Sequence, residues 1–241
     1  MSEQFQRTAA LLGEAAMSRL QSARVAVFGV GGVGGYVVEA LVRSGVGTVD
    51  VFDKDDVSVT NLNRQIIALH STVGQDKVSV IANRMRDINP DVVVNEHKMF
   101  YLPENADEID LTAYDFVVDA VDTVAAKIEL AVRCESLGVP LIAAMGAGNK
   151  LDPSRLQIAD IYKTSVCPLA RAMRTTLRKK GVKHLTVAYS TEEPVRPVAP
   201  LDNEDQLLAG SRRKDVPASA AFVPSAMGLL IASHVVRALA L

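Results

Sequence analysis

Residues 24–45 read RVAVFGVGGVGGYVVEALVRSG, and this stretch decides the fold. The apolar run over 24–29 predicts a short buried strand, and residues 36–45 predict a helix that ends at a glycine. Between them stand glycines in the G-x-G-x-x-G spacing, at Gly29, Gly31 and Gly34. Without Cβ atoms, such a turn lets phosphates approach the backbone N–H groups at the start of the helix. The stretch therefore predicts a nucleotide-binding strand–turn–helix unit.

The alternation of strands and helices continues on both sides of this unit. An acidic residue, Asp53, ends a second predicted strand (48–53), where the fingerprint places a carboxylate that accepts hydrogen bonds from ribose hydroxyls. A helix cap or a surface turn is the alternative role for this carboxylate. Further strands are predicted at 92–97, 114–122 and 140–146, and further helices at 6–21, 74–88 and 125–137. This order predicts an α/β, Rossmann-like, doubly wound and mostly parallel sheet.

The pattern changes after residue 148. Strands are predicted at 156–161 and 184–190, a short basic helix at 167–180, and a charged, proline-rich loop at 192–217. We therefore expect two parts of one domain: residues 1–150, a nucleotide-binding part with its N-terminal helix, and residues 151–241, a substrate-facing extension.

The last 25 residues, 217–241, are apolar and nearly long enough to span a bilayer. Pro224, His234 and Arg237 interrupt this run, and small residues outnumber Leu, Ile and Phe in it. We expect a buried helix here, packed on the sheet or against a second subunit, and no membrane partner.

Composition narrows the class of protein further. The 241 residues carry a net charge of −2, which excludes a globally basic nucleic-acid-binding protein. The two cysteines, Cys134 and Cys167, form no CxxC pair, and the N-terminus has no apolar signal segment. We expect a cytoplasmic protein.

The residues that follow Asp53 indicate which nucleotide binds. By itself the glycine fingerprint predicts NAD, so an oxidoreductase is the first alternative. However, Asn61, Arg64 and Lys77 follow closely in the sequence. A pyrophosphate bridge needs few cations, whereas the cleavage of a triphosphate needs cations on the departing oxygens. Taken singly, Arg64 or Lys77 is more often a solvated surface charge, but together behind this turn they favour ATP.

Two carboxylates close the predicted strand 114–122, at Asp119 and Asp122. The carboxyl ends of parallel strands face the ligand crevice, and Mg²⁺ binds one or two carboxylates together with phosphate oxygens. The alternative is that Asp122 or Thr123 only caps the helix that follows. We assign the metal role to Asp122 ahead of Asp119.

Residues 24–65, followed by GQDKV (74–78), INPDV (88–92) and VVDAVDT (117–123), resemble the ThiF, MoeB and HesA adenylating enzymes, relatives of ubiquitin-activating enzymes. The resemblance covers roughly residues 5–150. It implies magnesium on Asp122 and ATP bound through Gly29, Gly31, Gly32, Gly34, Asp53, Asn61, Arg64 and Lys77. It also implies a homodimer in which Arg7 reaches the triphosphate bound to the neighbouring subunit. Relatives often have another arginine where this chain has Gln4.

The second half resembles the branch of this family that acts on transfer RNA, the threonylcarbamoyladenosine dehydratases, at residues 146–174 and 217–236. The resemblance implies that ATP adenylates the threonyl carboxylate and that the carbamoyl oxygen then expels AMP, which closes an oxazolone ring. A sulfur-relay protein remains open as a further partner. Basic residues agree with an RNA substrate, although a solvated helix face also explains them: Arg155, Lys163, Arg171, Arg174, Arg178, Lys179, Lys180, Lys183, Arg212, Arg213 and Lys214.

Two alternatives remain beside the transfer-RNA dehydratase. One is an adenylating enzyme for a ubiquitin-like sulfur carrier, in which Cys167 could accept the acyl group as a thioester. Many such enzymes hold zinc on two CxxC pairs, which this chain lacks. Since cyclisation supplies its own nucleophile, we favour a structural role for both cysteines. The other alternative is an NAD-dependent oxidoreductase or a nucleotide sensor.

Overall fold

The computed structural model describes residues 2–199 and 217–241. Its strands are β1 (Arg24–Phe28), β2 (Thr48–Phe52), β3 (Val93–His97), β4 (Phe116–Asp119), β5 (Leu141–Ala144), β6 (Leu156–Asp160) and β7 (Thr186–Ser190). They form one seven-stranded sheet in the order β3-β2-β1-β4-β5-β7-β6. Only β6 and β7 pair antiparallel; the other neighbours are parallel. The predicted Rossmann-like sheet is therefore confirmed.

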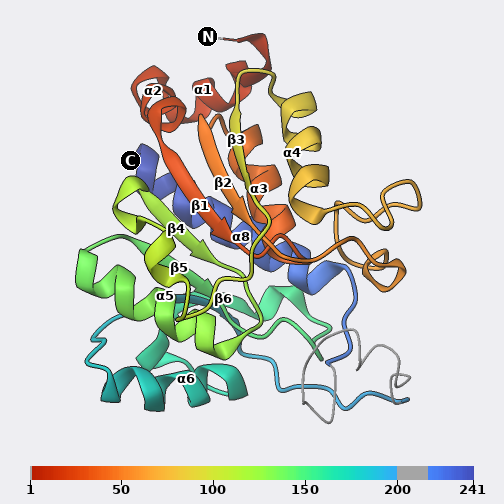
Figure 1. Cartoon of the computed structure of the whole chain (residues 1–241), viewed down its shortest axis with the longest axis vertical. Coiled ribbons are helices and arrows are strands. Elements are labelled where there is room, and N and C mark those ends of the chain that lie inside the picture. The colour runs from red at the N-terminus through yellow and green to blue at the C-terminus, as the bar shows by residue number, and fades with distance from the viewer. Residues whose placement is uncertain (1, 200–216) are drawn as a thin grey trace.

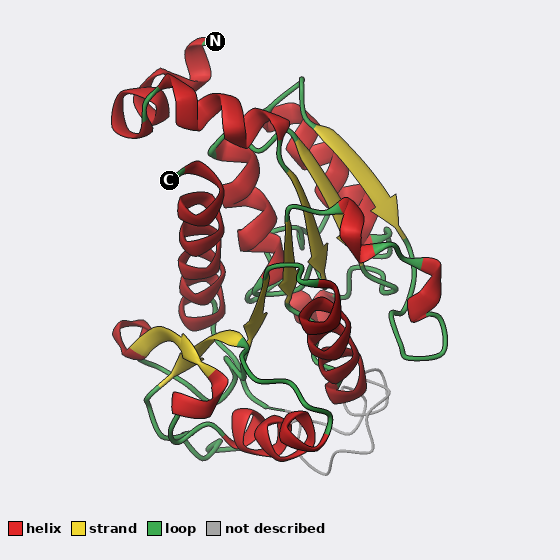
Figure 2. Cartoon of the chain, turned by 90° about the vertical axis from the view of Figure 1, so that its left-hand side faces the viewer, coloured by secondary structure: helices red, strands yellow, loops and turns green. Residues whose placement is uncertain are grey.

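Helices cover both faces of this sheet (Figure 2). They are α1 (Gln6–Leu12), α2 (Glu14–Ser22), α3 (Gly34–Arg43), α4 (Lys77–Ile88), α5 (Val124–Leu137), α6 (Pro168–Lys179) and α8 (Phe222–Ala240). In Figure 1, α3 and α8 lie behind the strands and α5 lies in front of them. Apolar residues of α2, α3, α4 and α8 share one core cluster, and those of α5 enter the clusters on the other face.

Two predicted helices differ most from the observed bounds, and a glycine with positive φ lies at each difference. The single helix expected over 6–21 is broken at Gly13, whose φ of +87° ends α1 and starts α2. Helix α4 begins at Lys77 rather than at residue 74, because Gly74 has a φ of +83°. A positive φ costs glycine little but interrupts helical geometry. Both regions are helical as predicted, but the break at Gly13 and the start of α4 were not predicted.

The apolar C-terminal segment forms α8, which packs against α3 and α2. A Cβ at Gly228 would lie 2.5 Å from the carbonyl oxygen of Val33, so this glycine allows α8 to cross the start of α3 closely. By length and composition alone α8 could cross a membrane, but core helices of soluble proteins pass the same test. Its packing agrees with the buried helix predicted from the sequence.

The second half of the chain continues the sheet of the first half. Strand β7 pairs with β5, and β6 pairs with β7 at the edge of the sheet. The chain then returns through α8 to the helices of the first half. The segment expected to face the substrate is thus joined to the nucleotide-binding part by hydrogen bonds and by apolar packing.

A buried carboxylate ties together the strands at the β3 edge. Asp50 on β2 is fully buried and accepts two hydrogen bonds from Arg24, at 2.8 Å each. Asn95 and His97 on β3 lie 3.1 and 3.0 Å from its oxygens. Burial raises the pKa of Asp50, but the hydrogen bonds from Arg24, His97 and Asn95 outweigh burial and hold the pKa below the ordinary value of 3.8.

Candidate nucleotide-binding site

The glycine turn joins the carboxyl end of β1 to the start of α3. Gly29 has a φ of +87°, and a Cβ there would lie 2.7 Å from the carbonyl oxygen of Ala120. A Cβ at Gly34 would lie 1.8 Å from the carbonyl oxygen of Gly29. A Cβ at Gly31 would have its nearest neighbour at 3.6 Å, and a Cβ at Gly32 would have its nearest neighbour at 3.4 Å. Both are van der Waals contact distances. Packing therefore requires Gly29 and Gly34, whereas Gly31 and Gly32 leave backbone that a ligand can approach.

Asp53 holds this turn in place. Its Oδ2 accepts a hydrogen bond from the backbone N–H of Val30 at 2.9 Å, and its Oδ1 accepts one from Asp55 N–H at 3.0 Å. The side chain is 10% exposed. The predicted acidic residue thus lies beside the glycine turn, and its side chain orders that turn.

Lys77 reaches the same place from the first residue of α4. It is buried, with its Nζ 3.1 Å from Asp55 Oδ2 and 3.9 Å from Asp53 Oδ1. A buried ammonium needs such partners because burial disfavours its charge. The structure therefore brings Lys77 and Asp53 together, as the sequence predicted.

The loop after β2 brings further polar groups to the turn. The aliphatic part of Arg64 lies 3.4 Å from the Cβ position of Gly32, and its guanidinium donates to Thr60 O and to Asn63 Oδ1 at 2.9 Å each. Asn61 is buried, and its Oδ1 accepts the N–H of Ser58 at 3.2 Å. Both residues thus help to shape the loop that carries them.

Gln65 is a residue of this site that the sequence analysis missed. It is 7% exposed, and its Nε2 lies 3.6 Å from the Cβ position of Gly31. Its Oε1 is buried and has no hydrogen-bond partner in the part of the chain that the structure describes. An unsatisfied buried amide beside a glycine turn is a group that a ligand could satisfy. The signal was its position directly after Arg64 in a stretch that otherwise turns apolar.

The two aspartates after β4 have different environments. Asp119 is fully buried, and Lys127 on α5 donates to its Oδ1 at 2.9 Å. Burial raises the pKa of Asp119, while Lys127 opposes that rise. Asp122 is exposed, and Thr123, not Asp122, is the N-cap residue of α5. The ranking of Asp122 ahead of Asp119 as a metal ligand therefore agrees with their exposure. Of the two residues named in the cap alternative, Thr123 takes the N-cap position, but no side chain makes a capping hydrogen bond there.

Arg7 lies near the amino ends of the strands, whereas the glycine turn follows the carboxyl end of β1. Gln4 donates to Asn89 Oδ1 at 3.0 Å, and Phe5 lies 3.8 Å from the Cβ position of Gly45. Asn89 and Gly45 lie a few residues before β3 and β2, so the N-terminal segment covers the amino ends of the strands, as Figure 1 also shows. Arg7 itself is exposed. It is therefore remote from the glycine turn of its own chain.

The basic segment is partly committed to structure. Arg174 donates to the carbonyl oxygens of Ile161 and Thr164, and Arg178 lies over the ring of Tyr162. Exposed cations of this segment have no ion-pair partner among residues 2–199 and 217–241: Lys163, Arg171, Arg178, Lys179, Lys180 and Lys183. Arg212, Arg213 and Lys214 lie outside the described residues.

Both cysteines are packed in apolar surroundings. Cys134 on α5 is 1% exposed, and burial raises the pKa of its thiol to about 12. Cys167 is 5% exposed and shares a core cluster with Ala170 and Met173 of α6. These surroundings agree with the structural role favoured from the sequence.

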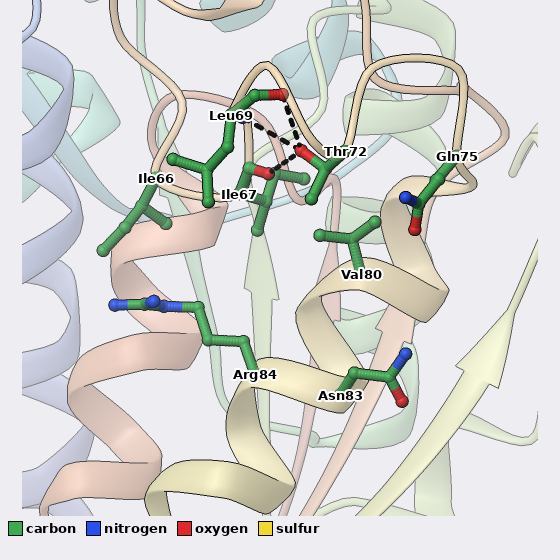
Figure 3. Close-up of a pocket in the computed structure, with 8 residues that line it drawn as sticks. All are labelled: Ile66, Ile67, Leu69, Thr72, Gln75, Val80, Asn83 and Arg84. Atoms are coloured by element: carbon green, nitrogen blue, oxygen red, sulfur yellow. Dashed lines mark hydrogen bonds between the residues drawn. The ribbon is translucent and has the colours of Figure 1, made fainter.

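A separate pocket of about 180 Å³ lies between the 66–75 loop and α4 (Figure 3). The hydroxyl of Thr72 closes this loop by donating to Ile67 O at 2.7 Å and accepting from Leu69 N–H at 2.9 Å. Ile66, Ile67, Leu69 and Val80 make much of the lining apolar. None of the predicted nucleotide-binding residues lines it. The pocket is therefore distinct from the site at the glycine turn.

Comparison with known proteins identifies the family. Residues 4–240 match the ThiF family. The chain belongs to this family. It is 45% identical over 240 residues to the tRNA threonylcarbamoyladenosine dehydratase of Bacillus subtilis (strain 168), an alignment that covers 98% of this chain and 94% of that protein. Identity to the Escherichia coli (strain K12) protein of the same name is 39%, covering 81% and 76% of the two chains.

A solved structure of a ThiF relative resembles this member closely. The crystal structure of the E. coli enzyme, TcdA, in complex with ATP superposes with a TM-score of 0.87 at 35% sequence identity. The match covers 98% of this chain and 93% of that one. It extends through β6, β7 and α8, so the resemblance includes the second half of the fold.

Proposed function

We propose that this member of the ThiF family is an ATP-dependent dehydratase that acts on threonylcarbamoyladenosine in transfer RNA. The 45% identity to the B. subtilis dehydratase over 98% of the chain carries this proposal. A glycine turn with approachable backbone, flanked by Asp53 and Lys77, supports the use of ATP.

The reaction needs two transfers at one carboxyl group. A threonyl carboxylate oxygen attacks the α-phosphorus of ATP, the bond to the β-phosphate breaks, and pyrophosphate leaves. The carbamoyl oxygen then attacks the activated carbonyl carbon, AMP leaves, and the carbamoyl nitrogen loses a proton as the oxazolone ring closes. The net change is the loss of one water from the nucleoside and the cleavage of ATP to AMP and pyrophosphate.

The chain's own groups suit the first transfer. Backbone N–H groups at Gly31 and Gly32, at the start of α3, would bind phosphate oxygens. Lys77 and Arg64 would neutralise the departing pyrophosphate. Since Asn61 Oδ1 already accepts the Ser58 N–H, its amide nitrogen would be the end that contacts the nucleotide. Asp53 would bind the ribose hydroxyls.

Asp122 fits a magnesium ion that is shared with phosphate. It is exposed at the carboxyl edge of the sheet, whereas Asp119 is buried against Lys127. Among the described residues, no group of three or more His, Cys, Asp or Glu side chains could hold a metal by itself. One carboxylate together with phosphate oxygens is the usual way in which Mg²⁺ is held. The bound ion would supply positive charge to the leaving pyrophosphate.

The remaining parts of the proposal concern partners. The exposed, unpaired cations on and around α6 support contact with the phosphates of transfer RNA, so residues 151–241 would be the RNA-facing part. The position of Arg7 near the amino ends of the strands, away from the glycine turn of its own chain, supports a homodimer in which Arg7 reaches the neighbour's nucleotide. Exposed Phe222 and Leu229 on α8 would contribute to that interface.

The decisive experiment is mass spectrometry of threonylcarbamoylated transfer RNA after incubation with the protein and ATP. We expect a modified nucleoside that is lighter by one water, together with AMP and pyrophosphate. An unchanged nucleoside alongside adenylation of a carrier protein that ends in Gly-Gly would replace this proposal with sulfur-carrier activation. Binding of NAD in preference to ATP would overturn adenylation altogether.

A further inference from the structure

A buried ion pair lies directly beneath the turn that carries Asp122. Lys127, 1% exposed on α5, donates to Asp119 Oδ1 at 2.9 Å and to the carbonyl oxygen of Ala144 at 2.7 Å. Asp119 is the last residue of β4, and Ala144 is the last residue of β5. One ammonium group therefore joins the carboxyl ends of two neighbouring strands to the first turns of the helix that follows β4.

The same carboxylate also holds the turn itself. Asp119 Oδ1 accepts the N–H of Val121 at 3.2 Å. Ala120 donates its N–H to Phe28 O at 2.8 Å, and its Cβ would lie 3.2 Å from a Cβ at Gly34. The 120–122 turn is thus held between the buried pair and the glycine turn, with Asp122 exposed at its outer end.

A contribution to protein stability does not by itself explain why this pair of charges is buried. Desolvation of two charges offsets most of their attraction, and apolar residues of similar volume commonly stabilise a core as well or better. Asp119 Oδ2 is buried without a hydrogen-bond partner in the described chain, so the pair does not even satisfy all of its own groups. Its neighbours on the buried face of α5 are apolar: Ala126, Leu130, Ala131 and Cys134.

We propose that Lys127 and Asp119 form a positioning pair, which fixes the 120–122 turn so that Asp122 meets the metal ion and phosphates beside the glycine turn. This inference rests on the proposed role of Asp122. Neither member of the pair touches the reacting atoms. Their effect is to hold a backbone segment whose freedom would otherwise weaken metal binding, as outer partners of metal ligands do elsewhere.

The test separates positioning from stability through a neutral version of the pair. Lys127→Met leaves Asp119 buried without its cation, whereas Lys127→Met combined with Asp119→Asn leaves no buried charge. Arg133→Met is the matched control, since it removes a cation paired with Glu129 and Asp107 farther along the same helix. Each protein is assayed for Tm, and for the affinity of a fluorescent ATP analogue in EDTA and over a magnesium titration.

For the wild-type chain we expect magnesium to tighten binding of the analogue. Lys127→Met should lower Tm and raise the half-saturating magnesium concentration by about tenfold or more, with unchanged affinity in EDTA. The double variant should recover Tm but keep the raised magnesium requirement, and it decides the question even if Lys127→Met fails to fold. The control should retain the wild-type magnesium response.

A double variant with both Tm and the magnesium response of the wild type would show that the pair is only structural. A wild-type chain that binds the analogue equally with and without magnesium would overturn the metal role of Asp122, and the positioning role with it. Loss of water from the modified nucleoside is measured separately. The proposed reaction can therefore stand or fall independently of this pair.

Discussion

At the scale of single residues, the glycines of the turn have different roles. Gly34→Ala would drive a Cβ to within 1.8 Å of Gly29 O, so the backbone must shift and we expect a large loss of Tm. Gly31→Ala meets no atom closer than 3.6 Å and should leave Tm nearly unchanged. We expect it instead to weaken ATP binding, because the new methyl group would lie where phosphate approaches the backbone. Thermal unfolding and calorimetric titration of both variants check this, and normal ATP affinity in a folded Gly31→Ala protein would contradict it.

Asp122 and Lys77 can be tested by the exchange of labelled pyrophosphate into ATP. Asp122→Asn should keep the fold, because the side chain is exposed, and should lower exchange by the equivalent of about 2–4 kcal/mol of barrier. Lys77→Ala should have a similar effect on exchange but should also lower Tm, since it removes the cation beside the largely buried Asp53. Asp87→Asn, another exposed aspartate, is the control. Unchanged exchange in both variants would refute these roles.

Asp50 predicts the direction of the pH dependence of stability. Its pKa is below 3.8 in the folded protein, so its contribution is fully present above about pH 4 and is lost as the pH falls through the folded-state pKa. Asp50→Asn removes charged hydrogen bonds and should lower the free energy of unfolding by about 1.5–3 kcal/mol at neutral pH. Urea unfolding from pH 7 to pH 3 should show the wild type and the variant converging as the pH falls. A constant difference over that range would contradict this account.

At the scale of elements, local sequence patterns predicted the strands and helices. They did not predict which side chains from different elements come into contact. The apolar runs at β1, β2 and β4 predicted buried strands, because each is short and ends in a glycine or a carboxylate. Lys127 was not predicted as part of the site, since its partner Asp119 lies eight residues earlier and faces it only after the helix packs. Its signal was its place in the apolar stripe of α5.

The basic helix α6 shows the same limit of local reasoning. Its basic composition agreed with RNA contact, yet Arg174 donates hydrogen bonds to backbone carbonyls, so its removal would disturb the fold as well as any RNA contact. Lys179 and Lys180 are exposed and are the better test. We expect Lys179→Gln combined with Lys180→Gln to weaken transfer-RNA binding and to reduce its log–log salt slope by about 1–2.

ATP affinity should be unchanged in this double variant, because α6 contributes none of the residues assigned to the nucleotide. The control is Arg43→Gln combined with Arg86→Gln. It removes one cation from α3, paired with Glu39, and one from α4, paired with Glu96 on β3. Equal salt slopes in the α6 variant and this control would place the RNA elsewhere on the protein.

At the scale of the whole molecule, the proposed role of Arg7 would make activity depend on assembly. Gln4 and Phe5 fix the N-terminal segment at the amino ends of the strands, whereas Asp122 follows the carboxyl end of β4. An arginine at the amino ends of the strands can contact a nucleotide at the carboxyl ends only if a second copy of the chain supplies it. The sequence suggested this role through resemblance alone, and the fold adds that Arg7 is remote from the glycine turn of its own chain.

Mixing two inactive variants tests this dependence. Arg7→Ala lacks the donated arginine, and Asp122→Asn lacks the metal ligand of the recipient site. When equal amounts of the two variants pair at random, about half of the dimers are heterodimers. In each heterodimer, one of the two sites combines intact Asp122 with intact Arg7, so about a quarter of all sites should regain activity. Each variant alone should stay inactive, and light scattering should report a dimer in every sample. If Arg7 acted within its own chain, the intact residues would never share a site and mixing would restore nothing; a fully active monomer would equally exclude donation by a neighbour.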